Sequence, residues 1–280
     1  MLESAVIKQQ NYRLDAQYAI ETPAFEGIDH AYSPNADWYS DFWNTVRPKF
    51  CNSSSEDLVI PTRLGIYFET LWLKAIDAHP DYQLICANLQ VNGEGRTLGS
   101  FDFLVRYIPD QTIEHWELAS KFYLALPLAS EWIWLGPNLN DYWQLKKQKM
   151  LSHQIQLGQR PEAKDALAAV GIGTIDKHRL VVKGRVYWPT TEANKLHWMT
   201  QQQWSSSQQT NNLHPVYEQP KHCWLGLSSN APQSINLTEQ VLTTPILITQ
   251  NGTQSFIVPN QWPEQAKQKA AGLGTAAFNT

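Results

Sequence analysis

Among the ionisable residues between positions 60 and 125, we single out four that have mostly apolar neighbours: Glu69, Asp102, Glu117 and Lys121. Charged groups inside an apolar pattern are costly to bury unless they are paired or bind a metal ion. Two or three carboxylates can hold Mg²⁺ or Mn²⁺, and such an ion polarises a phosphate and activates water. A nearby lysine can orient that water or stabilise developing charge. The combination suits hydrolysis of phosphodiester bonds, whereas the alternative is a buried Lys–Glu ion pair with no chemistry.

Three strand-like segments are expected to position these groups, at about 82–91, 98–108 and 112–124. Short turns separate them, which favours an antiparallel meander. Side chains alternate between the two faces of a strand, so Glu117 and Lys121 share a face, and Asp102 lies within the preceding strand. The three side chains are therefore expected to form one cluster.

Helices are predicted on either side of the meander. A helix at about 62–78 contains Glu69 and is expected to end at the following His-Pro pair, since the residue before proline disfavours helical backbone. A second helix, at about 140–157, brings Lys146, His153 and Gln154 near one face by their helical spacing. That face is either a substrate-positioning surface or a solvated helix face, and both interpretations stay open.

The order helix, three strands, helix and a further strand at 179–188 predicts an α/β fold. We expect a core domain at 37–190, including a short helix at 37–47, and a C-terminal elaboration at 191–280 that packs on the same domain. The Gln- and Ser-rich segment 201–212 is predicted to be a loop. Strands are expected at 224–225, 245–249 and 255–258, and the last fifteen or so residues are expected to fray.

The composition says more about the cellular compartment of the protein than about its binding partners. The 280-residue chain has a formal net charge of −4 and three widely spaced cysteines, which argues against a disulfide framework and favours the cytoplasm. Neither a signal peptide nor an apolar run of membrane-spanning length is expected. DNA remains a possible partner, because a local basic face can act within an acidic protein. Nothing in the composition predicts the oligomeric state.

Twelve tryptophans are an unusually large number for this length. Trp132, Trp134 and Trp143 lie close together in the sequence, near a Gly-Pro turn. Tryptophans mostly fill cores, but a group of them can also stack against nucleic-acid bases.

The runs GIYFETLWLKAI, GSFDFLV and EHWELASKFYL resemble the PD-(D/E)XK nuclease superfamily. The resemblance implies a restriction-endonuclease-like core and a metal-dependent nuclease. Asp102 and Glu117 would then be metal ligands, Glu69 a supporting carboxylate and Lys121 the catalytic lysine. Gln154 matches a glutamine that one branch of the superfamily carries on the next helix.

The motif departs from the superfamily pattern at one point. The superfamily places its lysine two positions after the glutamate, whereas Glu117 and Lys121 are four apart and Ala119 occupies the intervening position. Two hypotheses follow, namely a Mg²⁺- or Mn²⁺-dependent nuclease acting on DNA, and a catalytically inactive binding or scaffold protein of the same fold.

A closer resemblance extends from about 38 to 262. The segments WLGPNLNDYWQLKKQKMLSHQIQL, VKGRVYW and FIVPNQW are similar to an uncharacterised bacterial family, a domain of unknown function that has been grouped with the same superfamily. This family brings no activity with it.

Overall fold

Two compact units make up the computed structural model, which describes residues 2–26, 28, 31–52, 61–93, 95–129, 131–208, 214–226 and 234–272. Unit 1 comprises Met1–Ser120 and Lys147–Lys183, and unit 2 comprises Lys121–Lys146 and Gly184–Thr280. Each unit is therefore built from two separate stretches of the chain.

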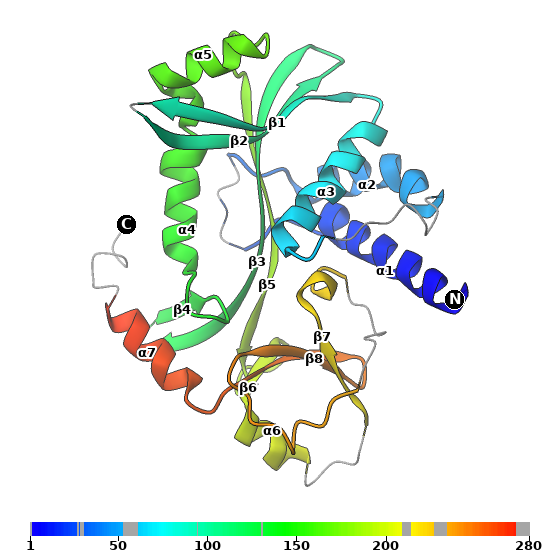
Figure 1. The fold of residues 1–280 in the computed structure, drawn as a ribbon, viewed down its shortest axis with the longest axis vertical. Helices are drawn as coiled ribbons and strands as arrows, with labels where there is room; N and C mark the ends of the chain where they lie inside the picture. Colours follow the sequence, from blue (N-terminus) through cyan, green and yellow to red (C-terminus); the bar gives the residue numbers. More distant parts are fainter. Residues whose placement is uncertain are drawn as a thin grey trace. The chain divides into compact units, whose positions relative to one another are not determined.

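The described strands form a large mixed sheet (Figure 1) with the order β1-β2-β3-β5-β6-β9-β8-β7, and β4 pairs with β3. Pairs β1–β2 and β2–β3 are antiparallel, whereas β5–β6 and β6–β9 are parallel. The predicted α/β class is confirmed at this level. The strands are β1 (Tyr82–Gly93), β2 (Arg96–Tyr107), β3 (Thr112–Leu128), β4 (Glu131–Leu135), β5 (Lys177–Pro189), β6 (Leu196–Thr200), β7 (Val216–Gln219), β8 (Ile246–Gln250) and β9 (Thr253–Val258).

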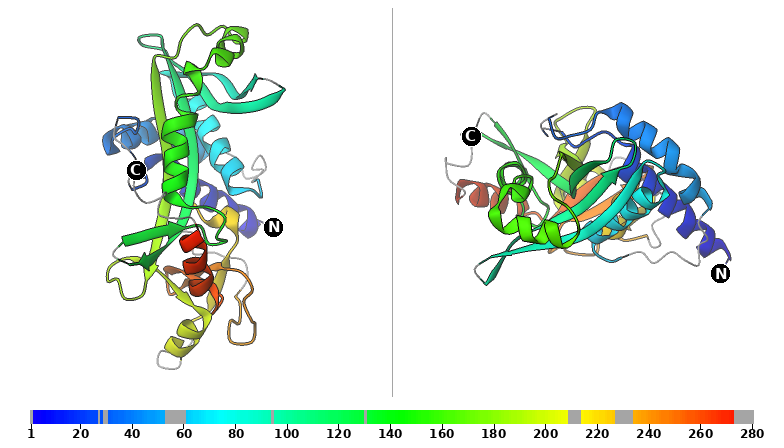
Figure 2. Two further views of the ribbon diagram at one scale, coloured as in Figure 1. Left: turned by 90° about the vertical axis from the view of Figure 1, so that its left-hand side faces the viewer. Right: turned by 90° about the horizontal axis from the view of Figure 1, so that it is seen from above.

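The helices of unit 1 that precede the meander pack against one another, as Figure 2 shows for α1 and α2. The α-helices among the described residues are α1 (Leu2–Glu21), α2 (Ala36–Asn52), α3 (Leu64–Ala78), α4 (Trp143–Lys149), α5 (Pro161–Ala169), α6 (Gln201–Gln208) and α7 (Trp262–Gly272). Helix α3 ends before His79 as predicted, and the backbone of His79 is extended because Pro80 follows it.

Apolar side chains fill the space on both sides of the meander of unit 1. On one side, the rings of Trp38, Phe42, Trp72, Tyr82 and Trp116 pack at centroid distances between 5.1 and 6.4 Å. A second cluster holds Val91, Phe101, Leu104, Leu157, Ala163, Leu167 and Ile172. Gly99 permits this contact, because a Cβ at Gly99 would lie 3.2 Å from the methyl groups of Leu157.

Unit 2 has its own core around the strands β6, β9, β8 and β7. Buried Trp204, Val216, Leu237, Ile248 and Ile257 form it, so helix α6 contributes the large ring of Trp204. The indole of Trp198 donates to the carbonyl of Ala125 at 2.8 Å, which ties β6 to the unit 2 part of β3.

Several predicted elements are wrong. The helix expected at 140–157 is the short helix α4 followed by a π-helix (Met150–Gln154) and a 3₁₀ turn (Leu157–Gln159). Segment 201–208 is helix α6 instead of a loop, and the strand expected at 224–225 is irregular chain after a 3₁₀ turn, Lys221–Cys223. Positions 209–212 and 273–280 lie outside the described residues, and α7 continues to Gly272.

No helix in the part of the chain that the structure describes is both long and apolar enough to cross a bilayer.

Candidate functional site

The predicted site residues are divided between the two units. Unit 1 contains Glu69 on α3, Asp102 on β2, Glu117 on β3, and His153 and Gln154 on the π-helix. Two lysines, Lys121 and Lys146, belong to unit 2. The candidate site is therefore described first from the residues of unit 1.

Glu117 is the most buried of the predicted ligands, with a side chain that is 2% exposed. Its Oε2 accepts a hydrogen bond from Nε2 of Gln154 at 2.6 Å, and its Oε1 lies 2.9 Å from Nε2 of His115. These two contacts engage both oxygens of the carboxylate and orient Glu117.

The π-helix between Met150 and Gln154 brings Gln154 to this contact. The N–H of Ile155 donates to the carbonyl of Met150 at 2.9 Å, five residues back, so the turn is wider than an α-helical one. Such a turn changes the direction in which the following side chains point, and short π-segments are frequent at functional sites. The α-helical spacing that related Lys146 to Gln154 does not continue through this segment.

Asp102 lies where the pairing of β2 with β3 ends. The last residues in register are Phe103 and Trp116, and beyond them Oδ2 of Asp102 accepts a hydrogen bond from the N–H of Leu118 at 2.9 Å. The side chain of Asp102 thus replaces a ladder hydrogen bond next to Glu117. Its position one residue past the end of the register brings two acidic positions of adjacent strands together.

The pKa of Glu69 depends on its burial and on the charge of Asp102. Burial, and next the negative charge of Asp102, raise the pKa of Glu69, whereas a hydrogen bond from Asn88 acts in the opposite direction. Asn88 lies between the paired residues Ala87 and Leu89, opposite Asp102, and has the positive φ of 53° that asparagine tolerates. Glu69 and Asp102 are therefore electrostatic neighbours, and the sequence pattern gave no reason to select Asn88.

Two histidines extend the contacts of Glu117. Nδ1 of His115 lies 3.3 Å from Nδ1 of His178 on β5, and burial lowers the pKa of each imidazole to about 4. Both rings are therefore neutral at pH 7. A neutral His115 that donates from Nε2 to Glu117 accepts at Nδ1, so His178 donates from its own Nδ1. The alternation of β3 placed His115 beside Glu117, but nothing local indicated His178.

The other face of β3 holds a different carboxylate. Glu114 is 1% exposed and accepts hydrogen bonds from Nε and Nη2 of Arg179 at 2.5 and 2.9 Å, and from the indole of Trp116 at 2.7 Å. The guanidinium lies 4.7 Å from the ring of Trp38. This is a bidentate, aromatic-covered ion pair, which fits a structural role.

Lys121 makes its described ion pair within unit 2. Its Nζ lies 2.5 Å from Oδ2 of Asp141, and the two side chains are 25% and 34% exposed. Burial, and then Asp141, raise the pKa of Tyr123. Asp141 is thus the acidic partner of Lys121. Gly136 permits the local turn, because a Cβ there would lie 3.1 Å from that of Asp141.

Other contacts are described for the remaining predicted residues, His153 and Lys146. Nδ1 of His153 lies 3.2 Å from Nη2 of Arg160, so His153 contacts another basic side chain. The backbone N–H of Lys146 donates to the carbonyl of Tyr142, as helix α4 begins. Neither contact assigns the residue to substrate.

A metal ion would have to be held by few protein ligands. Within the described ranges, no group of three or more His, Cys, Asp or Glu side chains has a metal-binding arrangement. Mg²⁺ commonly keeps several waters and needs only one or two carboxylates. Asp102 and Glu117 fit that smaller donor set, and Glu69 lies within electrostatic reach of Asp102.

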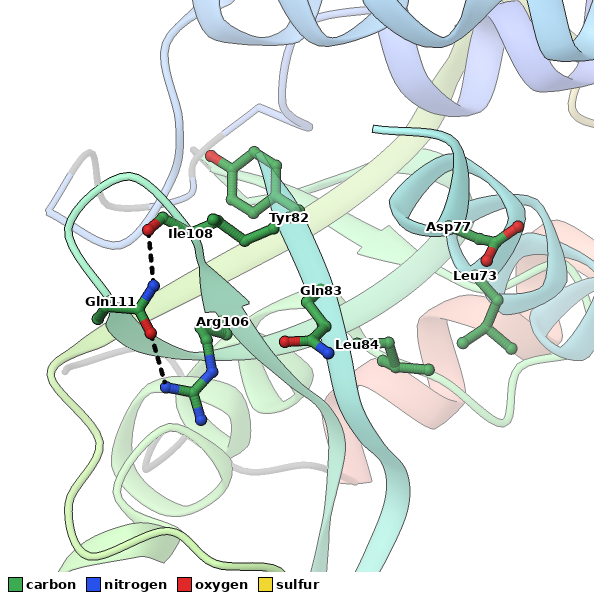
Figure 3. Close-up of a pocket in the computed structure, with 8 residues that line it drawn as sticks. All are labelled: Leu73, Asp77, Tyr82, Gln83, Leu84, Arg106, Ile108 and Gln111. Atoms are coloured by element: carbon green, nitrogen blue, oxygen red, sulfur yellow. Dashed lines mark hydrogen bonds between the residues drawn. The ribbon is translucent and has the colours of Figure 1, made fainter. Parts of the chain in front are cut away.

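A separate cavity of about 700 Å³ opens elsewhere in unit 1 (Figure 3). Arg106 donates to Oε1 of Gln111 at 3.2 Å, and Gln111 donates to the carbonyl of Ile108 at 2.8 Å. The residues described as lining this cavity are Leu73, Asp77, Tyr82, Gln83, Leu84, Arg106, Ile108 and Gln111. None of the predicted metal ligands is among these residues.

Comparison with known proteins gives one family. Neither the curated proteins nor the solved structures contain a match to this chain. None of these comparisons links the chain to the PD-(D/E)XK superfamily. The model of a domain of unknown function, DUF1853, matches residues 46–270, close to the range expected from the sequence. Because this match covers most of the chain, the chain belongs to the DUF1853 family.

Proposed function

We propose that this protein is a metal-dependent nuclease that hydrolyses phosphodiester bonds in DNA, with a core of the PD-(D/E)XK type. The observation that carries the proposal is the carboxylate group of unit 1. There Glu117 is buried and oriented by two donors, next to Asp102. The order helix, antiparallel meander, helix and strand also agrees with such a core.

The electrostatics of unit 1 favour a divalent cation. The negative charge of Asp102 raises the pKa of Glu69, so ionisation of each carboxylate disfavours ionisation of the other. The amide of Gln154 and the imidazole of His115 contact the two oxygens of Glu117 and orient its carboxylate. A cation bound by Asp102 and Glu117 would relieve this repulsion.

The residues of the chain then have distinct tasks. Asp102 and Glu117 would hold Mg²⁺ or Mn²⁺, and the ion would supply Lewis-acid polarisation of a phosphate and an activated water. Gln154 and His115 fix the direction of the Glu117 oxygens, as the outer partners of a metal-binding carboxylate do. Glu69 adds negative charge beside Asp102.

Lys121 enters the proposal through the sequence resemblance, as the group that orients water or stabilises the phosphate. Its ammonium group lies against Asp141, a contact that the resemblance does not include. In this role Lys121 acts on the water or the phosphate and does not bind the metal. Lys121→Met should therefore abolish cleavage while metal binding is retained.

Calorimetric titration of Mn²⁺ into the full chain tests the metal site before any activity is measured. Asp102→Asn keeps an acceptor for the N–H of Leu118 and removes the charge, so it should weaken Mn²⁺ binding at least about tenfold without unfolding the chain. The matched control is Asp165→Asn, on the exposed side of α5. Equal Mn²⁺ affinity in wild type and Asp102→Asn would show that the site is wrong.

Cleavage is measured next, on single-stranded and duplex DNA with Mg²⁺ or Mn²⁺. The proposal expects products with the wild type and the Asp165→Asn control, and none with Asp102→Asn. Cleavage that survives in Asp102→Asn would exclude a catalytic role for this group.

An inactive nuclease-like protein is the second candidate. It is favoured by the described ion pair between Lys121 and Asp141 and by the absence of a three-group metal cluster among the described residues. It predicts no saturable Mn²⁺ binding and no cleavage. Saturable Mn²⁺ binding therefore separates the two candidates. Metal binding without cleavage would support the metal site and contradict the proposed reaction.

A further inference from the structure

Two tryptophans share one face of the short strand β4 in unit 2. Trp132 and Trp134 alternate with Ile133 and Leu135, which are each 1% exposed. Because alternate residues of a strand face opposite ways, β4 buries its aliphatic face and turns its tryptophans the other way. Both indoles are only half-buried, so part of each ring reaches solvent.

A third tryptophan joins them from β5. The ring of Trp188 lies 5.0 Å from that of Trp132, at 71°, and 6.4 Å from that of Trp134, at 78°. Strand β3 pairs with β4, and it places Pro127 opposite Trp132 and Ala125 opposite Trp134. These residues of β3 lack long side chains, which leaves room for the rings from the two flanking strands to meet.

The packing covers part of these rings. Trp134 also stacks on Trp143, with ring centroids 6.3 Å apart and planes at 23°, so one face of Trp134 is in contact. Trp132 and Trp188 meet edge to face, so neither ring covers the other completely. Trp188 is also half-buried. The group Trp132, Trp134 and Trp188, which we call the tryptophan platform, is therefore a surface feature and not a closed core.

A lysine provides the charge of this surface. Nζ of the exposed Lys195 lies 5.2 Å from the centroid of Trp188. An ammonium group at this position repels cationic ligands such as methylated lysine side chains, and it attracts an anion placed beside an aromatic surface. A nucleic acid strand offers both parts of such a ligand, since its bases stack on indoles and its phosphates pair with lysine.

We propose that the tryptophan platform binds single-stranded nucleic acid, with bases stacked on Trp132 or Trp188 and a phosphate at Lys195. Bases in a duplex are already stacked on one another, so a platform of ring faces selects unpaired strands. Glu131, exposed at the start of β4, limits the attraction for phosphate on that side. The site belongs to unit 2 and does not depend on the metal site of unit 1.

Fluorescence anisotropy with a dye-labelled oligothymidine of about twelve nucleotides tests this site on the full chain, in EDTA. Trp132→Leu and Trp188→Leu should each weaken binding about tenfold, within the range expected for a lost base stack. Trp132→Phe should restore most of the affinity, because it returns an aromatic face. Lys195→Gln should make the salt dependence shallower by about one phosphate contact.

The control for charge is Lys221→Gln, which changes another exposed lysine of unit 2 and should leave binding unchanged. Thermal unfolding of each variant shows whether unit 2 remains folded. The proposal is overturned if the wild type does not bind the oligonucleotide, if folded Trp132→Leu and Trp188→Leu bind as the wild type does, or if duplex or a neutral oligosaccharide binds more tightly. The binding measurement in EDTA does not depend on metal-dependent cleavage. A failed nuclease assay would therefore not contradict oligonucleotide binding, and failed oligonucleotide binding would not contradict the nuclease proposal.

Discussion

Two buried carboxylates three positions apart on β3 have opposite surroundings. On one face, Glu114 is held by the bidentate guanidinium of Arg179. On the other face, the hydrogen bonds described for Glu117 come from the amide of Gln154 and the imidazole of His115, a ring that is neutral at pH 7. A guanidinium compensates a buried carboxylate charge directly, whereas neutral donors only orient it.

The proposed function gives these two carboxylates different roles. Glu114 has a cationic partner whose own ring contacts, to Trp38 and Trp116, fix it in place. Glu117 accepts from Gln154 and contacts His115, and it lies beside Asp102, as the proposed cation site requires. Equal burial of the two residues, 1% and 2%, would not have distinguished them.

Removing Arg179 should have the largest effect on stability. Arg179→Met leaves the Glu114 charge buried without its bidentate partner, and it should lower the free energy of unfolding by about 3–5 kcal/mol. Urea denaturation measures the change. The double variant Glu114→Leu with Arg179→Met should recover most of this loss, because an apolar pair of similar volume often replaces a buried ion pair without cost. A single variant within about 1 kcal/mol of wild type would contradict the structural role.

The pH dependence of stability examines the Glu117 face. Burial lowers the pKa of His115 from the usual 6.5 to about 4. Between these values the unfolded chain binds a proton that the folded chain does not, so stability falls as the pH is lowered from 6.5 towards 4. The loss from His115 alone should reach about 3 kcal/mol at most.

His115→Gln sharpens this test, because an amide can donate to Glu117 and is not protonated in this range. Urea denaturation between pH 7 and pH 4.5 should give a flatter profile for this variant than for wild type. The control is His214→Gln, which replaces an exposed histidine of unit 2 and should keep the wild-type slope. An unchanged slope in His115→Gln would mean that other groups control acid stability.

The half-exposed pair of unit 2 should give the smallest effect. Lys121 and Asp141 are 25% and 34% exposed, so solvent screens their attraction. Lys121→Met and Asp141→Asn should each cost about 1 kcal/mol or less in urea denaturation, and the cost should shrink at high salt. A loss as large as that of Arg179→Met would remove the contrast between buried and half-exposed ion pairs in this protein.

Elements with a strong periodic pattern were predictable. Helix α3, the meander β1–β3 and strand β5 appear near their expected positions because apolar spacing and turn residues mark them. The π-helix was missed, since the sequence of Met150–Gln154 also fits an α-helix and the wider turn accompanies packing on β2. Helix α6 was missed because its Gln- and Ser-rich sequence has little apolar pattern beyond Trp204.

The sequence by itself determined which side chains of β3 share a face, because alternation along a strand is a local property. It therefore placed His115 beside Glu117, and likewise Trp132 beside Trp134 on β4. Only the tertiary structure decided what those faces meet. The partners Gln154, His178 and Arg179 come from positions 37 to 65 residues away, and their approach depends on the pairing of strands and the packing of helices.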